Sequence, residues 1–170
     1  MKNKIFNPIF MFVIGATLGV ASKLFDIHTK ILGNIFSEFA IWILLGTIIS
    51  IYSEDKKKAM INVFLFSIGM LITYYLTAHI THSVYGWTFI KGWTIFACIS
   101  PIFAYFTWMT KEKGILPIII RIGISGVSIF CSLFLFTVNI FDLIINLVLI
   151  YFLFLKKWKE LIIKRKITIL

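Results

Sequence analysis

Residues 74–91 contain the side chains of this sequence that are best suited to chemistry. Within a chain that is otherwise largely apolar, this stretch holds His79 and His82, several aromatic residues and Lys91. Tyr75, His79 and His82 follow the spacing i, i+4, i+7, which places them on one face of a helix. Imidazole, phenol and ammonium groups can bind a polar solute or exchange protons. The pattern predicts the end of one helix, a short turn and the start of the next.

Other polar residues lie at the same level of the predicted helices. Ionisable groups inside a membrane usually face the bundle interior, a partner or a water-filled cavity. We therefore expect an outward-facing polar pocket. Its predicted ligand-binding residues are Glu38, Tyr75, His79, Lys91, Asp142 and Asn146. A position at the membrane–water interface is the alternative, and it fits Asp26, His28, His82 and Lys91 well.

The elements that carry these residues are membrane helices. The chain has 170 residues, of which 60% are hydrophobic and 14% charged, whereas soluble domains average about 25% charged residues. At ~20 residues per span, this length predicts an all-α, polytopic integral membrane protein with six transmembrane helices and a single domain, 1–170. The expected helices are 5–23, 37–53, 59–82, 91–110, 116–136 and 138–156, followed by a basic tail, 157–170.

The start of the chain has two interpretations. Lys2 and Lys4 precede an apolar run that ends in small residues, as in a signal peptide. Because five further apolar segments follow, we favour a first helix that is retained.

The distribution of basic residues predicts the topology. Fourteen of the 17 Lys and Arg residues fall on one side, at 2–4, 56–58, 111–121 and 156–166, and the other side has Lys23, Lys30 and Lys91. The positive-inside rule places both termini in the cytoplasm. The same distribution accounts for the net charge of +10 without a nucleic-acid partner. Richness in Ile, Phe and Lys favours the plasma (inner) membrane of a bacterium with an AT-rich genome.

Small residues predict where helices approach closely. Gly15 and Gly19 form a Gly-x-x-x-Gly pattern in the first helix, and Gly46 begins a small-residue face in the second. Such patterns bring helix backbones together, within the chain or against a membrane partner subunit.

Catalytic and metal-binding patterns are weak. His79 and His82 share a face, but no His-Glu-x-x-His motif, phosphate loop or nucleophile elbow occurs. We predict no metal, no cofactor, no catalytic residue and no disulfide between Cys98 and Cys131. An intramembrane or lipid-modifying enzyme is an open alternative. A pore along Arg121, Ser125, Ser128 and Ser132 is another, although serines in membrane helices often bond to their own helix or to a neighbouring one.

Two resemblances add expectations. The runs GATLGVASKLFD (15–26), IWILLGT (41–47), GMLITYY (69–75), SPIFAYFTW (100–108) and KEKG (111–114) resemble a family of small, uncharacterised six-helix bacterial membrane proteins, a domain of unknown function. The architecture is similar to the substrate-binding S components of energy-coupling-factor transporters. In that family a small-residue face of the first helix docks on a coupling subunit, which implies Gly15 and Gly19 here.

The expected function is that of a small membrane protein that binds a small polar solute from the outer side as a transporter component. The alternative is a non-catalytic structural or interaction subunit of a membrane complex. The expected partners are the lipid bilayer, a membrane subunit and a small-molecule ligand.

Overall fold

The computed structural model describes residues 6–134 and 139–155, and every regular element within them is helical. The helices are α1 (Pro8–His28), α2 (Lys30–Ser37), α3 (Phe39–Tyr52), α4 (Lys56–Ile80), α5 (Trp87–Met109), α6 (Ile115–Phe134) and α7 (Ile140–Ile150), and α7 continues as a π-helical segment, η1 (Tyr151–Leu155). The all-helical fold is confirmed. The basic tail, 157–170, lies outside the described residues, as do Lys2 and Lys4.

Local polar groups set the starts of three helices. The side chain of Asn7 accepts a hydrogen bond from the backbone N–H of Ile9, and Pro8 occupies the first helical position of α1. Asp55 accepts from the N–H of Lys58 at the start of α4. Asn139 and Asp142 form a reciprocal capping box at the start of α7.

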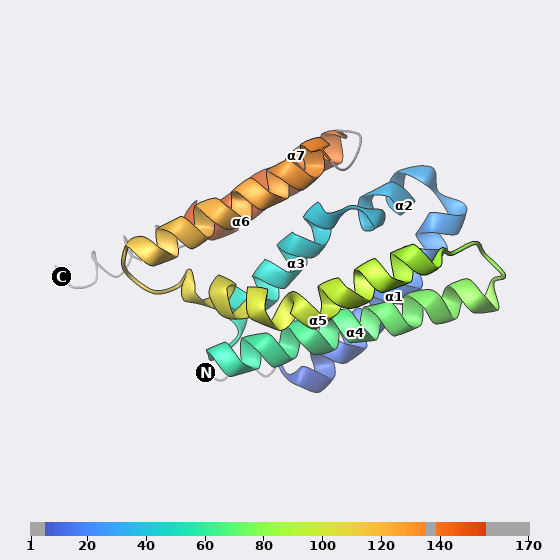
Figure 1. Cartoon of the computed structure of the whole chain (residues 1–170), viewed down its shortest axis with the longest axis horizontal. Helices are drawn as coiled ribbons and strands as arrows, with labels where there is room; N and C mark the ends of the chain where they lie inside the picture. Colours follow the sequence, from blue (N-terminus) through green and yellow to red (C-terminus); the bar gives the residue numbers. More distant parts are fainter. Residues whose placement is uncertain (1–5, 135–138, 156–170) are drawn as a thin grey trace, which may run out of the picture.

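The helices run between two ends of the molecule (Figure 1). At the Lys56 end, α1, α4 and α6 begin; at the Glu38 end, α3, α5 and α7 begin. Helices α1, α4 and α5 form one group, and α6 and α7 form a hairpin on the other side. Helix α3 lies between them and contacts α4, α5, α6 and α7.

Four helices are long and apolar enough to cross a membrane, namely α1, α4, α5 and α6. Helix α3 has 14 residues, which corresponds to roughly 21 Å at ~1.5 Å per residue. The apolar segment Ile140–Leu155 is also shorter than these four helices. A hydrocarbon core is ~30 Å thick. Membrane-crossing capacity is therefore established by length and composition for four of the six expected spans.

The segment 23–37 differs from the expected loop. Helix α1 continues to His28, and α2 fills most of the remainder. The expected first helix ends at residue 23, but Lys23 and Asp26 lie three residues apart on α1 and form an ion pair of 2.6 Å. The neutralised pair lets the helix continue.

Gly15 and Gly19 of α1 lie against α4 of the same chain. A Cβ built on Gly15 would lie 2.1 Å from the carbonyl oxygen of Phe66, and one on Gly19 would lie 2.3 Å from that of Met70. Thr73 Oγ1 donates to the carbonyl of Ala16 at 2.7 Å. Gly46 makes no such approach, because its Cβ would lie 4.0 Å from the nearest atom, on Val63.

Candidate functional site

A cavity of about 620 Å³ lies at the Glu38 end. Its walls come from α1, α4 and α5, the segment 84–86, and the two residues Phe36 and Phe39 that flank the α2–α3 junction. We call it the tyrosine cavity, because Tyr74, Tyr75 and Tyr85 contribute most of its hydroxyl groups. The remaining walls are mainly aromatic and aliphatic. Such a combination of an apolar wall and a few polar groups is typical of small-molecule sites.

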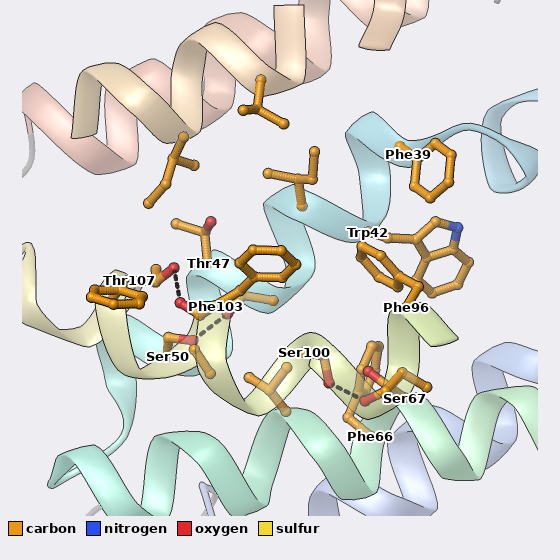
Figure 2. A pocket seen from close by; sticks show the side chains of 18 of the residues that line it. Phe39, Trp42, Thr47, Ser50, Phe66, Ser67, Phe96, Ser100, Phe103 and Thr107 are labelled. Carbon is orange, nitrogen blue, oxygen red and sulfur yellow. Dashed lines mark hydrogen bonds between the residues drawn. The ribbon is translucent and has the colours of Figure 1, made fainter. Parts of the chain in front are cut away.

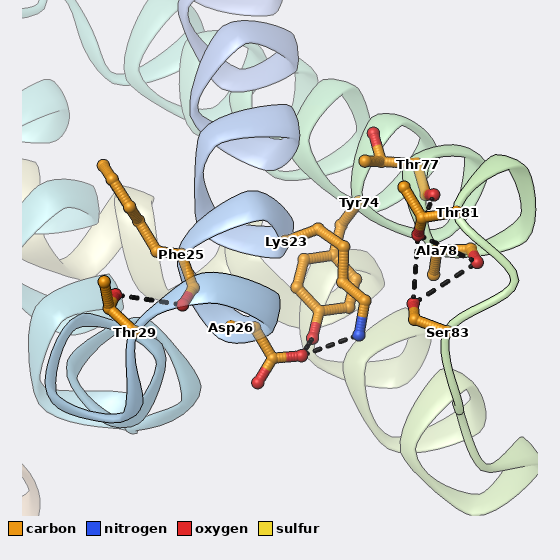
Figure 3. Close-up of polar contacts among 9 residues, drawn as sticks. All are labelled: Lys23, Phe25, Asp26, Thr29, Tyr74, Thr77, Ala78, Thr81 and Ser83. Carbon is orange, nitrogen blue, oxygen red and sulfur yellow. Dashed lines mark hydrogen bonds and ion pairs between the residues drawn. The ribbon is translucent and has the colours of Figure 1, made fainter.

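The charged part of this cavity is a cluster of Lys23, Asp26 and Tyr74 (Figure 3). Lys23 is only 3% exposed, and its Nζ donates to Asp26 Oδ2 at 2.6 Å. Tyr74 donates its hydroxyl hydrogen to the same oxygen at 3.3 Å, and Lys23 Nζ lies 5.2 Å from the centroid of the Tyr74 ring. The Asp26 side chain remains 36% exposed. The cluster thus presents a partly exposed carboxylate whose basic partner is buried.

The predicted residue Tyr75 lines this cavity. Its ring lies 5.2 Å from that of Tyr74 and 6.0 Å from that of Tyr85, measured between centroids. His79 and Lys91 are exposed and lie outside the residues that line the cavity. Of the six predicted ligand-binding residues, Tyr75 is therefore the one that the structure places here.

Glu38, Asp142 and Asn146 come together elsewhere. Glu38 occupies the break between α2 and α3, and Asp142 lies in the first turn of α7. The two residues are 6% and 1% exposed, and Glu38 Oε2 and Asp142 Oδ1 are buried oxygens without a hydrogen-bond partner among the described residues. Asn146 lies one turn below Asp142 and donates to its backbone carbonyl at 2.8 Å. We call Glu38 and Asp142 the acid pair.

Packing of α3 against α7 brings the acid pair together. Ala40 and Leu44 of α3 belong to one buried apolar cluster with Ile145 and Leu149 of α7. Both helices begin at the Glu38 end, so this parallel contact aligns their first residues. The dipoles of two helix N-termini then favour negative charge at the same place.

A second cavity, of about 530 Å³, lies nearer the middle of the helices (Figure 2). Helices α3, α4, α5 and α6 line it with mainly apolar side chains and with the hydroxyls of Thr47, Ser50, Ser67, Ser100 and Thr107. We call it the apolar groove. Gly46 lines it, as do Gly123 and Cys131 of α6.

Two cavity residues, Lys23 and Asp26, were assigned to a loop or an interface by sequence reasoning. Their i, i+3 spacing with opposite charge was the available signal for a pair on a continuing helix. Tyr74 could be suspected only as the neighbour of Tyr75, because its contact with Asp26 joins residues 48 positions apart.

Among the described residues, no three side chains of His, Cys, Asp or Glu are grouped so that they could hold a metal ion. Comparison with known proteins finds no match: no family model, curated protein or solved structure is significantly similar to this chain. Fold and composition define the class, which is an all-helical protein with several helices that are compatible with a multi-pass membrane protein.

Proposed function

We propose that this protein is a six-span plasma-membrane protein of a bacterium, with both termini in the cytoplasm. In this proposal it binds a small polar solute from the outer side in the tyrosine cavity, as a non-catalytic component of a transporter. The observation that carries the proposal is a cavity of about 620 Å³ with a partly exposed carboxylate, Asp26, at its wall.

The topology rests on charge. Lys56–Lys58, Lys111 and Lys113 are at the Lys56 end, which the positive-inside rule assigns to the cytoplasm. The Glu38 end is then the outer one, and the tyrosine cavity belongs to it. Six spans require α3 and the α7–η1 segment to cross as well, which helices of this length can do across a locally thinner bilayer.

The walls suggest the chemistry of the solute. The Asp26 carboxylate and the tyrosine hydroxyls suit a donor group such as an amine. The rings of Tyr75, Tyr85 and Trp93 can contact an apolar or positively charged part of the solute, since aromatic faces attract cations. We therefore expect a small solute that carries an amino group on an aliphatic or aromatic frame.

Ligand-induced thermal shifts of the purified protein test this proposal. Amino acids, biogenic amines and amine-containing vitamins are screened against the wild type and Gly92→Leu. Gly92 lines the cavity, and a Cβ on it would meet no atom within 4 Å, so a larger side chain can enter the cavity without a backbone clash. We expect at least one compound to stabilise the wild type and to lose this effect in Gly92→Leu.

The matched control is Gly123→Leu, since Gly123 is equally free of neighbours within 4 Å of a Cβ but lines the apolar groove. It should retain the ligand response. A screen without any response, together with native mass spectrometry that finds no bound small molecule, would contradict the proposal. Equal loss of response in both variants would place the ligand elsewhere.

A role as a non-catalytic interaction subunit is the second candidate, and the apolar groove favours it. The α6–α7 hairpin lies on the other side of α3 from the α1, α4 and α5 group, and both α5 and α6 line the groove. A membrane helix of a partner subunit would fill this apolar space. In that case Gly123→Leu should abolish co-purification of the partner from native membranes, whereas Gly92→Leu should leave it intact.

A further inference from the structure

The apolar groove is long and thin. On α5 its lining extends from Trp93 to Thr107, which corresponds to roughly 21 Å at ~1.5 Å per residue. A volume of about 530 Å³ over this length gives a mean cross-section of roughly 25 Å². A helix with a diameter of ~10 Å has a cross-section of roughly 80 Å². The groove therefore has room for a single extended hydrocarbon chain, whereas a partner helix would enter it only after α5 and α6 had moved apart.

The polar groups in the walls of the groove are largely bonded already. Three of its five hydroxyl groups, those of Ser50, Ser100 and Thr107, donate to backbone carbonyls of their own helices at 2.7, 2.7 and 2.8 Å. The other walls are mainly aliphatic and aromatic. A polar ligand would lose its hydration here without gaining hydrogen bonds in return. The walls therefore favour an aliphatic occupant.

The groove is accessible from the outside of the molecule. Phe103 and Phe106 of α5 and Val127 of α6 line the groove and are also exposed. Both helices are long and apolar enough to cross a membrane. In a bilayer these exposed side chains contact the acyl chains of lipids. A lipid chain can therefore enter the groove from the side.

Basic residues lie close to one end of the groove. Its lining residue Thr107 precedes Lys111 by four residues, and the turn 110–114 joins α5 to α6 at the Lys56 end. The segments 54–58 and 111–121 of this end together contain six basic and three acidic residues. Lys113 is exposed, and it forms no ion pair with another described residue. Such a region attracts the headgroups of anionic lipids.

We propose that the apolar groove binds one acyl chain of an anionic phospholipid, whose phosphate group lies against Lys113. Packing of the chain against the groove walls and attraction of the headgroup to the Lys56 end supply the affinity. The proposed topology assigns this lipid to the cytoplasmic leaflet. The proposal does not depend on a solute in the tyrosine cavity, so a failed solute screen leaves it unaffected.

Native mass spectrometry of the purified full chain tests this proposal. The probes are phosphatidylglycerol and phosphatidylcholine with identical acyl chains. We expect the wild type to bind one phosphatidylglycerol at least fivefold more tightly than phosphatidylcholine. Gly123 lines the groove and a Cβ on it would meet no atom within 4 Å, so Gly123→Leu should fill the groove and weaken binding of both lipids at least tenfold.

Gly126→Leu is the matched control for the groove. Gly126 is an exposed glycine of the same helix and is equally free of neighbours within 4 Å of a Cβ, but it is outside the groove lining. This variant should bind both lipids as the wild type does. A wild type that retains no lipid, or equal losses in the two glycine variants, would overturn the proposal.

Lys113→Gln tests the position of the headgroup. It should abolish the preference for phosphatidylglycerol while phosphatidylcholine still binds. Lys91→Gln is the control, because Lys91 is an exposed lysine near the opposite end of α5, and it should keep the preference. A preference that persists in Lys113→Gln would overturn the placement of the phosphate group.

Photocrosslinking locates the chain. Phosphatidylglycerol with a photoreactive diazirine in its acyl chain should label peptides of α3, α5 and α6 in proteoliposomes, and Gly123→Leu should remove the label from α3. Unchanged labelling of α3 in this variant would place the lipid outside the groove and overturn the proposal. Loss of a co-purified membrane subunit in Gly123→Leu, with no lipid bound to the wild type, would assign the groove to a partner helix instead.

Discussion

Gly15 of α1 lies so close to Phe66 of α4 that a Cβ on the glycine would be 2.1 Å from the Phe66 carbonyl oxygen. Gly69 makes the reciprocal approach, since its Cβ would lie 2.6 Å from the carbonyl oxygen of Phe12. The α1–α4 contact thus has two backbones in near contact, as in small-residue helix pairs of membranes. The face that the energy-coupling-factor resemblance assigns to a coupling subunit is packed against α4 within the chain.

Gly15→Ala should therefore destabilise the fold. The added methyl group would force α1 away from α4, and overpacking of this kind costs about 1–3 kcal/mol. Gly46→Ala is the control, because a Cβ on Gly46 would lie 4.0 Å from the nearest atom, on Val63. The higher helix propensity of alanine should leave the free energy of unfolding of this variant unchanged or raise it by up to about 1 kcal/mol. Thermal unfolding in detergent, followed by size-exclusion chromatography, measures both. Equal melting temperatures for the two variants would contradict the close approach.

Thr73→Val tests the hydrogen bond across the same contact. Thr73 Oγ1 donates to the carbonyl of Ala16 in α1 at 2.7 Å. The isosteric valine removes this donor, and interhelical hydrogen bonds in membrane proteins are worth about 0.6 kcal/mol on average. In the control, Thr94→Val, the lost bond runs to Ile90 of the same helix, so α1 and α4 should keep their contact. Cysteine crosslinking between α1 and α4 should become less efficient only in the Thr73 variant.

Ser100 compensates for a proline in α5. Pro101 has no N–H to donate to the carbonyl of Ala97, and Ser100 Oγ donates to this carbonyl at 2.7 Å instead. Ser100→Ala should lower the free energy of unfolding by about 1 kcal/mol, because it leaves a buried carbonyl without a partner. In a Pro101→Ala background position 101 regains its N–H, and Ser100→Ala should then have little effect. Additive losses in the double variant would show that Ser100 acts in some other way.

The Lys23–Asp26 pair should respond asymmetrically to loss of either partner. Lys23 is 3% exposed, whereas the Asp26 side chain is 36% exposed. Asp26→Ala leaves a buried ammonium group without its carboxylate and should cost about 2 kcal/mol or more. Lys23→Met leaves a carboxylate that water can reach and should cost less than about 1 kcal/mol. Melting temperatures of the two variants and of their double variant give the test. The double variant should be more stable than Asp26→Ala alone, and the reverse order would contradict the burial of Lys23.

Apolar runs and charges were sufficient to predict most of the fold. The runs are long and are separated by charged or turn-forming residues, so the long helices lie within a few residues of their expected ranges. The exception is the segment 23–37, which we expected to connect two helices. Most of it is helical, and the oppositely charged residues Lys23 and Asp26 belong to α1. The Gly-x-x-x-Gly pattern favoured a close helix approach, but α4, against which Gly15 and Gly19 lie, could not be identified from spacing alone.

The grouping of the polar residues was decided by tertiary structure. The sequence by itself determined that Glu38, Tyr75 and Asp142 lie at one end of the helices, because helix length and direction set the level of each residue. It could not determine which of them meet, because this depends on the order of the helices around the bundle. Packing of α3 against α7 brings together the helix starts that carry Glu38 and Asp142, and it leaves Tyr75 with Tyr74 and Tyr85 in a separate cavity. The order of the helices around the bundle is set by contacts between residues far apart in the chain, and the helical periodicity of the sequence does not reveal these contacts.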